Sequence, residues 1–239
     1  MMQEKHISSA FDRDLEQLQA LVMKMGGLVE SSIHEATDAL INSDEELAQR
    51  VRKADKAIDA LEEDVNQKAA RLIALRAPVA SDLRTVLTVM KIAANLERCG
   101  DYTKNLAKRT TALANMSSID EADRAIRRMA RDVGLMLKDA LDAYIQRDVD
   151  LAEEVRQRDA DVDQMYNALF RDLLTHMMED PRNITACMHL HFIAKNMERM
   201  GDHVTSIAEQ VIYLVTGVMP DEARPKSDVT SYNEEDGKS

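Results

Sequence analysis

Two acidic motifs of the same kind stand far apart in the chain, each placing a glutamate four residues before an aspartate. LERCGD at 96–101 returns as MERMGD at 197–202, and the 16-residue windows that begin at 92 and 193 agree at half of their positions. Core packing needs only apolar residues of suitable size. It does not need the same Glu, Arg, Gly and Asp at the same spacing, so the repeat points to chemistry. The matched residues, all 101 positions apart, are Ile92/Ile193, Ala93/Ala194, Asn95/Asn196, Glu97/Glu198, Arg98/Arg199, Gly100/Gly201, Asp101/Asp202 and Ala107/Ala208.

The carboxylates of each motif are predicted to share one helix face. Two carboxylates one turn apart repel each other unless a cation lies between them, and their oxygens suit hard or borderline metal ions. At about 100° per residue they lie well round the helix from its apolar stripe, so burial in the core does not explain them. The two stripes are Ile92, Leu96, Cys99, Thr103, Leu106 and Ile193, Met197, Met200, Val204, Ile207.

The preceding helix of each copy adds a second acidic pair. Asp55 and Asp59, followed by Glu63, run down one flank of their helix, and Asp159 and Asp163 stand 104 positions later. If the two helices pack antiparallel across the short proline turn between them, four carboxylates per copy converge on one groove. The predicted metal ligands are Asp55, Asp59, Glu97 and Asp101 in the first copy and Asp159, Asp163, Glu198 and Asp202 in the second. The ordinary alternative is a solvated helix face.

Other repeated residues have supporting roles in this hypothesis. Gly100 and Gly201 each cost about 1 kcal/mol inside a helix, so their repetition indicates a close helix contact beside the acids. Four further polar residues could orient carboxylates from the second shell, although a salt bridge accounts equally well for the two arginines: Asn95, Arg98, Asn196 and Arg199. His191 and His203 have no histidine counterpart in the first copy and are weaker ligand candidates.

Apolar spacing predicts six helices in two equivalent sets of three. They run from near Ser8 to Leu40, Leu47 to Ile73, Ser81-Asp82 (as the cap) to Leu106, Ile126 to Tyr144, Leu151 to Leu173 and Ile184 to Val215. Asn42-Ser43-Asp44 is predicted to end the first helix and cap the second. The fold class is therefore all-α, two tandem three-helix bundles related by internal duplication. The predicted domains are 1–113 and 119–217, and the polar composition of 218–239 predicts a disordered acidic tail.

Composition supports this picture and excludes several functions. The 239 residues are 45% hydrophobic, contain 3% aromatic residues and carry a net charge of −12, which argues against a nucleic-acid partner. The absence of a long apolar run or signal peptide predicts a cytoplasmic protein. Cys99 and Cys187 form no CxxC pair and are expected to be thiols, with Cys99 a small buried core residue.

These motifs resemble the PhoU family of accessory regulators of bacterial phosphate uptake, over roughly residues 8–215. The resemblance is carried by LERCGD and MERMGD, by PVASDLR at 78–84 and by MMEDPR at 177–182. It implies two three-helix bundles whose D/ExxxD motifs, at the eight positions given above, bind iron, zinc, magnesium or manganese ions. The acidic 22-residue C-terminus has no place in the family pattern.

The resemblance also implies a regulatory function. A family member represses the phosphate-starvation response by linking the ATPase subunit of the phosphate ABC transporter to a sensor histidine kinase, and it reaches the membrane only through these partners. Exposed apolar helix faces are compatible with a homodimer. The sequence contains no Walker A loop or nucleophile motif, so an adaptor is favoured over an enzyme.

Three other classes of protein are alternatives to this interpretation. A ferritin-like di-iron protein needs Glu-x-x-His motifs, and none of the six histidines has a Glu three residues before it. A histidine-phosphotransfer bundle would use His34 or His176, without supporting context. A metal-free helical adaptor is the plainest alternative. The basic rows Lys104/Lys108 and Arg124/Arg128/Arg131 are partner patches or, more simply, solvated faces.

Overall fold

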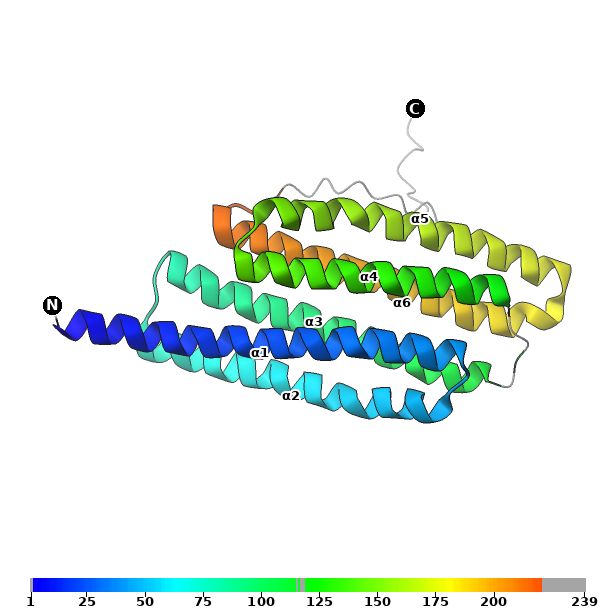
Figure 1. Ribbon diagram of the computed structural model, residues 1–239, viewed down its shortest axis with the longest axis horizontal. Coiled ribbons are helices and arrows are strands. Elements are labelled where there is room, and N and C mark those ends of the chain that lie inside the picture. Colours follow the sequence, from blue (N-terminus) through cyan, green and yellow to red (C-terminus); the bar gives the residue numbers. More distant parts are fainter. Residues whose placement is uncertain (1, 115, 117–118, 221–239) are drawn as a thin grey trace, which may run out of the picture.

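The described part of the chain is built entirely from helices. A computed structural model describes residues 2–114, 116 and 119–220. The chain forms six long helices. Figure 1 shows that successive helices run in opposite directions along the long axis of the molecule. Their bounds are α1 Met2–Ile41, α2 Glu45–Arg76, α3 Ser81–Leu113, α4 Asp120–Gln146, α5 Val149–Glu179 and α6 Ile184–Thr216, with a 3₁₀ turn at Pro181–Asn183 before α6.

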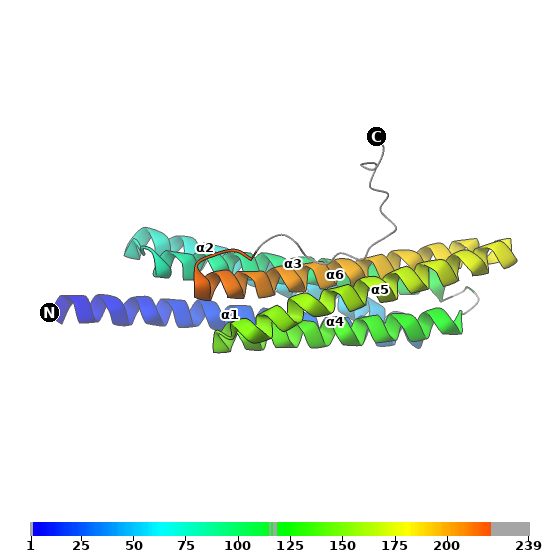
Figure 2. The same cartoon turned by 90° about the horizontal axis from the view of Figure 1, so that it is seen from above.

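The six helices form the two three-helix bundles that the repeat predicts. Helices α1–α3 pack together, and so do α4–α6. The bundles lie side by side with their long axes aligned (Figure 1), and α3 and α6 run along each other between them (Figure 2). The helices that carry the two acidic motifs therefore also form the larger part of the contact between the two copies, and α1 and α4 form the rest.

The predicted apolar stripes form the core. Every residue of both stripes is at most 1% exposed, and each large aliphatic side chain buried in this way contributes about 1.5–3 kcal/mol. The stripes of α3 and α6 meet across the seam, where the Cys99 thiol donates to the backbone oxygen of Met200, with 3.9 Å between Sγ and O. The prediction that Cys99 is a buried core residue is confirmed, and burial raises the pKa of its thiol to about 12.

The predicted helix boundaries were right at one turn and wrong at another. Asp44 caps α2 as expected, because its side chain accepts from the Leu47 amide at 2.9 Å. The expectation that Ser81-Asp82 caps α3 is wrong, since the cap position is Ala80, whose side chain makes no capping bond. The turn around Pro78 places Ala77 (φ 45°) and Ala80 (φ 49°) in positive-φ conformations. Ser81 is thereby already the first helical residue.

Two further features concern the membrane and the predicted tail. No helix among the described residues is long and apolar enough to cross a bilayer. Helix α6 ends at Thr216 and is capped by Gly217, whose φ of 81° is the left-handed conformation that glycine adopts without strain. The tail predicted to be disordered lies outside the described residues from 221 onward.

Candidate metal centres

In the first copy, a buried aspartate of α2 lies against a glycine of α3. Asp55 is only 3% exposed. A Cβ atom on Gly100 would lie 3.5 Å from Asp55 Oδ1 and 3.1 Å from Ile58 Cδ1. The close helix contact expected at Gly100 is present, and it is what brings the α2 carboxylate up to the acidic motif of α3.

A lysine lies between this aspartate and the second acid of the motif. The Lys104 ammonium is 2.5 Å from Asp55 Oδ2 and 3.4 Å from Asp101 Oδ1. The hydrogen bond to Asp55 is the main reason that the pKa of Lys104 is raised. Asp55 Oδ1, the oxygen that faces Gly100, is buried without a hydrogen bond. The site therefore already holds one positive charge and keeps a buried carboxylate oxygen unsatisfied.

The pKa values of Asp59 and Glu97 in the first copy are both raised. Partial burial is the largest cause for both Asp59 and Glu97, and the next is a neighbouring carboxylate, Asp55 for Asp59 and Asp101 for Glu97. Glu62 acts on both in the same direction. These groups thus form one negative cluster across α2 and α3, the condition in which binding a cation relieves repulsion.

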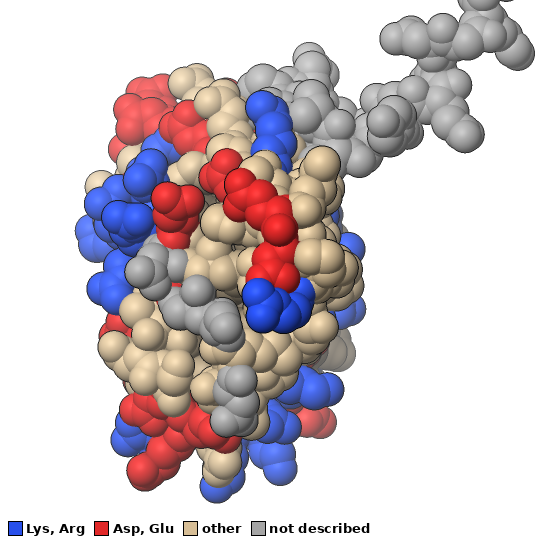
Figure 3. Space-filling model, turned by 90° about the vertical axis from the view of Figure 1, so that its right-hand side faces the viewer, with Lys and Arg blue, Asp and Glu red and all other residues tan. Residues whose placement is uncertain are grey.

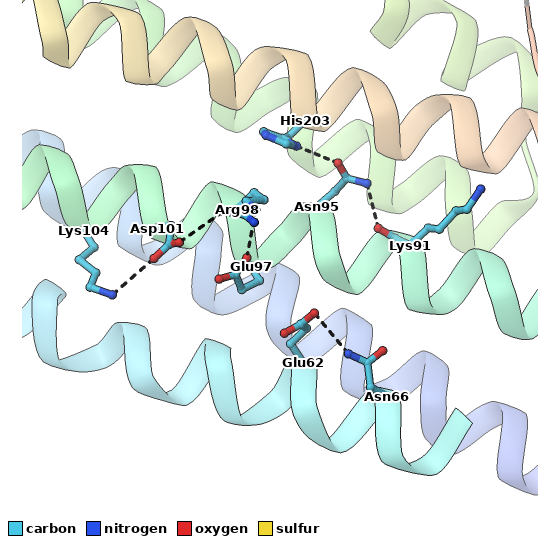
Figure 4. A network of polar contacts seen from close by, with 9 residues as sticks. All are labelled: Glu62, Asn66, Lys91, Asn95, Glu97, Arg98, Asp101, Lys104 and His203. Atoms are coloured by element: carbon cyan, nitrogen blue, oxygen red, sulfur yellow. Dashed lines mark hydrogen bonds and ion pairs between the residues drawn. The ribbon is translucent and has the colours of Figure 1, made fainter. Parts of the chain in front are cut away.

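Glu62 belongs to this cluster, whereas Glu63 does not. Figure 4 shows Glu62 on α2 directed toward Glu97 on α3. Glu63 is exposed and accepts a bond from Gln67 Nε2 at 3.0 Å instead. Glu62 follows Asp55 by seven residues, which is two full helical turns, while Glu63 is rotated about 100° further. That spacing was the signal in the sequence, and the expectation for Glu63 is corrected accordingly.

The residues expected to orient the carboxylates lie around the cluster in different ways. Arg98 is 3.7 Å from Glu97 and 4.0 Å from Asp101, with its side chain 61% exposed. The Asn95 amide is engaged elsewhere: Nδ2 donates to the Lys91 carbonyl at 2.8 Å, and Oδ1 lies 2.9 Å from His203 Nδ1 of the second copy (Figure 4). Arg199 is exposed, and Asn196 is partly buried.

The second copy repeats the arrangement, and its Asp163 and Glu198 are more buried than Asp59 and Glu97 of the first copy. Asp159, Asp163 and Glu198 are 9%, 8% and 6% exposed. A Cβ atom on Gly201 would lie 3.0 Å from Asp159 Oδ1, so Gly201 faces Asp159 in the same way that Gly100 faces Asp55. The glycine-to-aspartate contact is therefore a duplicated feature of the two sites.

The second copy also has a lysine, but from a different position. Lys195 Nζ is 2.9 Å from Glu198 Oε1 and lies 4.9 Å from the centre of the Tyr166 ring. Burial raises the pKa of Glu198, and Asp202 and Asp163 add to this while Lys195 opposes it. Glu198 Oε2 is buried without a hydrogen bond. Tyr166 stands where the first copy has Glu62, so the second site has one carboxylate fewer and an aromatic ring in its place.

The carboxylates are close enough to interact but are not arranged as a finished metal site. Within residues 2–114, 116 and 119–220, no three Asp, Glu, His or Cys side chains are grouped closely enough to hold an ion as they stand. The residues present nevertheless suit a cation. Each copy has several acids on two packed helices, and each has a buried carboxylate oxygen without a hydrogen bond, Asp55 Oδ1 and Glu198 Oε2.

The two histidine candidates have other surroundings. His191 lies among the rings of Tyr166, Phe170 and Phe192, with centroids 5.3–5.9 Å away. Burial lowers its pKa, and Lys195 lowers it further. His203 contacts Asn95 and lies 5.6 Å from the Tyr102 ring, so it is part of the seam between the copies.

Comparison with known proteins places this architecture in a family. The PhoU domain model matches residues 22–110 and 126–211, which are the two halves of the chain. The phosphate-specific transport system accessory protein PhoU homolog of Rhizobium meliloti (strain 1021) is 46% identical over 230 residues, covering 96% of this chain and 97% of that protein. The protein of the same name from Zymomonas mobilis (strain ATCC 31821) is 49% identical over 222 residues, covering 92% and 93%.

Solved structures agree with the sequence comparison. The crystal structure of PhoU from Pseudomonas aeruginosa superposes with a TM-score of 0.84 at 39% identity. The superposition covers 87% of this chain and 100% of the Pseudomonas chain. The phosphate transport system regulatory protein PhoU from Streptococcus pneumoniae gives a TM-score of 0.82 at 31% identity, covering 88% and 99%. The fold, the duplicated motifs and these relatives together lead to one conclusion: the chain belongs to the PhoU family.

Proposed function

We propose that this protein is a metal-binding negative regulator of the phosphate-starvation response and of phosphate uptake. It acts in the cytoplasm as an adaptor between the ATPase subunit of the phosphate ABC transporter and a sensor histidine kinase. Relatives that match nearly the whole chain are named accessory proteins of the phosphate-specific transport system. The adaptor role, the kinase and the metal are our extension of those names to this chain.

The observation that carries the metal proposal is the buried aspartate held opposite a glycine in both copies. Asp55 and Asp159 are kept out of water by close helix packing, in which a Cβ atom on Gly100 or Gly201 would make a contact of 3.1 or 3.0 Å. Asp55 Oδ1 and Glu198 Oε2 are buried without a hydrogen bond. Such burial of a carboxylate oxygen is costly, and a bound cation would remove that cost. Oxygen ligands of this kind suit magnesium, manganese, iron and zinc.

Each copy offers its own set of ligands to such an ion. In the first copy Asp55, Asp59, Glu97 and Asp101 would hold it, with Glu62 at the edge of the cluster. In the second copy Asp159, Asp163, Glu198 and Asp202 would do so. A bound ion supplies positive charge. These side chains position it on the flank of each bundle, where occupancy changes the charge presented to a partner protein.

Metal binding is tested by calorimetry and elemental analysis. We expect the chelator-treated wild type to bind Mn²⁺ or Zn²⁺, and Asp55→Asn/Asp101→Asn to lose the first site at least tenfold in affinity. Asp159→Asn/Asp202→Asn should do the same for the second. Glu63→Gln is the matched control, because Glu63 neighbours Glu62 in sequence but is exposed and outside the cluster. Equal metal content in wild type and in all variants would overturn the proposal.

The regulatory role is tested in cells that lack the gene. We expect alkaline phosphatase to be high in phosphate-rich medium, and to be repressed again when the wild-type protein is supplied. Crosslinking in the same cells should recover the transporter ATPase subunit and the kinase. Full repression in the deletion strain would contradict the regulatory role, whatever the metal measurements show.

Self-association is part of the proposal. Apolar side chains are exposed around the turn between α5 and α6, where Met178 is 85% exposed and Ile184 45%. Such surface favours a contact between copies. Light scattering on the purified protein should give a dimer mass, and a monomer mass at all concentrations would exclude this component.

One observation favours a second candidate, the metal-free adaptor. The Lys104 ammonium already bridges Asp55 and Asp101, so the first copy has an internal cation. In this case the clusters would be structural, and the regulatory role would persist in variants that bind no metal. The cell assay with Asp55→Asn/Asp101→Asn separates the two candidates.

A further inference from the structure

A row of arginines on α4 lines a hollow that the metal proposal does not involve. Arg124, Arg127, Arg128 and Arg131 lie on the first half of this helix, and His34, Thr37 and Asp38 of α1 form the opposite wall. The hollow has a volume of about 380 Å³. Figure 3, which views the end of the molecule where α4 begins, shows Lys and Arg side chains gathered on one flank.

The guanidinium groups in this row are largely unneutralised. Arg131 pairs with its neighbour Asp132 at 3.0 Å. Among the described residues, Arg124, Arg127 and Arg128 form no ion pair, and all three are exposed. Asp38 is the one acid that lines the hollow within the part of the chain that the structure describes. A cluster of positive charge is unexpected on a protein whose net charge is −12, because the surface of such a protein is negative on average and repels anions.

A second hollow shares two of these arginines. Arg124 and Arg128 also face a space of about 340 Å³ between α4 and α5, together with Glu121 and Asp172. The acids there leave that hollow without an excess of positive charge. The anionic ligand is therefore expected on the α1 side, with Arg124 and Arg128 forming the ridge between the two hollows.

The dimensions indicate what the α1 side can hold. From Arg124 to Arg131 the helix rises about 10 Å at 1.5 Å per residue, which is longer than a single oxyanion. Guanidinium groups bind phosphate and carboxylate oxygens in bidentate fashion. The lining of the hollow includes His34 but no Phe, Tyr or Trp among the described residues, so it provides little for stacking a nucleobase.

We propose that this hollow binds a small polyanion that carries two or more oxyanion groups, either a phosphoanhydride or a polycarboxylate. Its walls come from α1 of the first copy and α4 of the second, so a bound ligand bridges the two copies. The inference uses residues of neither metal cluster and is independent of the function proposed above. The bound ligand stabilises the contact between the two bundles through ion pairs.

The test measures binding of three small anions to the full-length, metal-free protein by calorimetry, in low salt and with chelator removed. Tripolyphosphate and citrate represent the two sources of oxyanion groups, and orthophosphate represents a single group. We expect at least one of the first two to bind tenfold or more tightly than orthophosphate, and to raise the melting temperature as a ligand of the folded state must. Affinity should fall as sodium chloride is added.

Substitutions then locate the site. Arg124→Gln/Arg128→Gln should weaken binding at least tenfold, whereas Arg50→Gln/Arg52→Gln, which removes two exposed arginines from α2 instead, should change it less than twofold. Circular dichroism checks that both variants are folded. Asp55→Asn/Asp101→Asn should leave anion binding within twofold of wild type, which separates this result from that of the metal experiment.

Three outcomes would overturn the inference. The first is equal affinity of wild type and Arg124→Gln/Arg128→Gln. The second is orthophosphate binding as tightly as the larger anions. The third is tighter binding of a glutamate-rich peptide than of either small polyanion, because that result would make this surface a docking site for an acidic protein segment.

Discussion

At the scale of single residues, two lysines act as built-in counter-ions and come from unrelated positions. Lys104 of α3 pairs with Asp55 and Asp101, and Lys195 of α6 pairs with Glu198. The position equivalent to Lys104 is Thr205, and the one equivalent to Lys195 is Ala94. The duplicated acids are thus neutralised separately in each copy. The two copies therefore share the acidic residues at these positions but do not share the lysines that neutralise them.

Removing the Lys104 charge should reveal what the acidic cluster costs. We expect Lys104→Met to lower the free energy of unfolding of the metal-free protein by about 1–2 kcal/mol. Loss of one partner of a buried pair costs 3–5 kcal/mol, and the value is smaller here because the Lys104 side chain is 42% exposed. The measurement is urea unfolding with and without Mn²⁺, and the ion should reduce the cost by taking over the neutralisation.

Lys108→Met is the control for this substitution. Lys108 is exposed one turn further along α3 and forms no ion pair among the described residues. Its replacement should change stability by less than about 0.5 kcal/mol. If both variants are equally stable, the ion pair to Asp55 contributes nothing and the cluster does not need a cation.

The sequence predicted which acids gather on α2 and α3 better than it predicted the groups around them. Asp55 and Gly100 could be identified because duplication preserved them in spite of their cost. Glu62 was missed because it has no acidic counterpart in the second copy, where Tyr166 follows Asp159 at the same interval. The part that Lys104 plays could not be predicted, since a long flexible side chain reaches its partner only once α2 and α3 are packed.

At the scale of helices, periodicity fixed the number, order and buried faces of the six elements. Boundaries set by side-chain caps were also predictable, as Asp44 shows. The start of α3 was not, because it depends on positive-φ conformations at Ala77 and Ala80, residues whose intrinsic preference is for a helix.

The caps of α2 and α5 provide a matched pair of stability tests. Asp44 accepts from the Leu47 amide at 2.9 Å, and Asp148 accepts from the Leu151 amide at 3.0 Å. We expect Asp44→Ala and Asp148→Ala each to lower the free energy of unfolding by about 1 kcal/mol, measured by denaturant unfolding. The two effects should add in the double variant because the helices belong to different bundles.

Conservative substitutions serve as the comparison. Asp44→Asn and Asp148→Asn keep the side-chain oxygen that accepts the bond and should cost only a few tenths of a kcal/mol. A loss as large as that of the alanine variants would show that the charge near the helix N-terminus matters more than the cap.

At the scale of the whole molecule, the seam between α3 and α6 connects the two acidic clusters and the cores of the two copies. The Cys99 thiol donates to the Met200 backbone, the Thr103 hydroxyl lies 3.5 Å from Met200 Sδ, and Asn95 meets His203. Because both acidic motifs are carried by the seam helices, opening the seam would disturb both clusters together. The two bundles are therefore expected to unfold as one cooperative unit.

Alkylation of Cys99 should report on this seam. The thiol is fully buried, and its pKa is raised from the usual 9.0 to about 12 by burial. In a Cys187→Ala background at pH 8, we expect iodoacetamide to modify Cys99 at least a hundredfold more slowly than in urea, followed by mass spectrometry. Because the unfolded thiol ionises at lower pH than the folded one, the stability that this group contributes is lost as pH rises above about 9.

If polyanion binding holds the copies together, tripolyphosphate should slow modification of Cys99 further in this background but not when Arg124→Gln/Arg128→Gln is added. Rapid labelling of the folded protein would instead mean that the seam opens readily and that the two bundles behave as separate units.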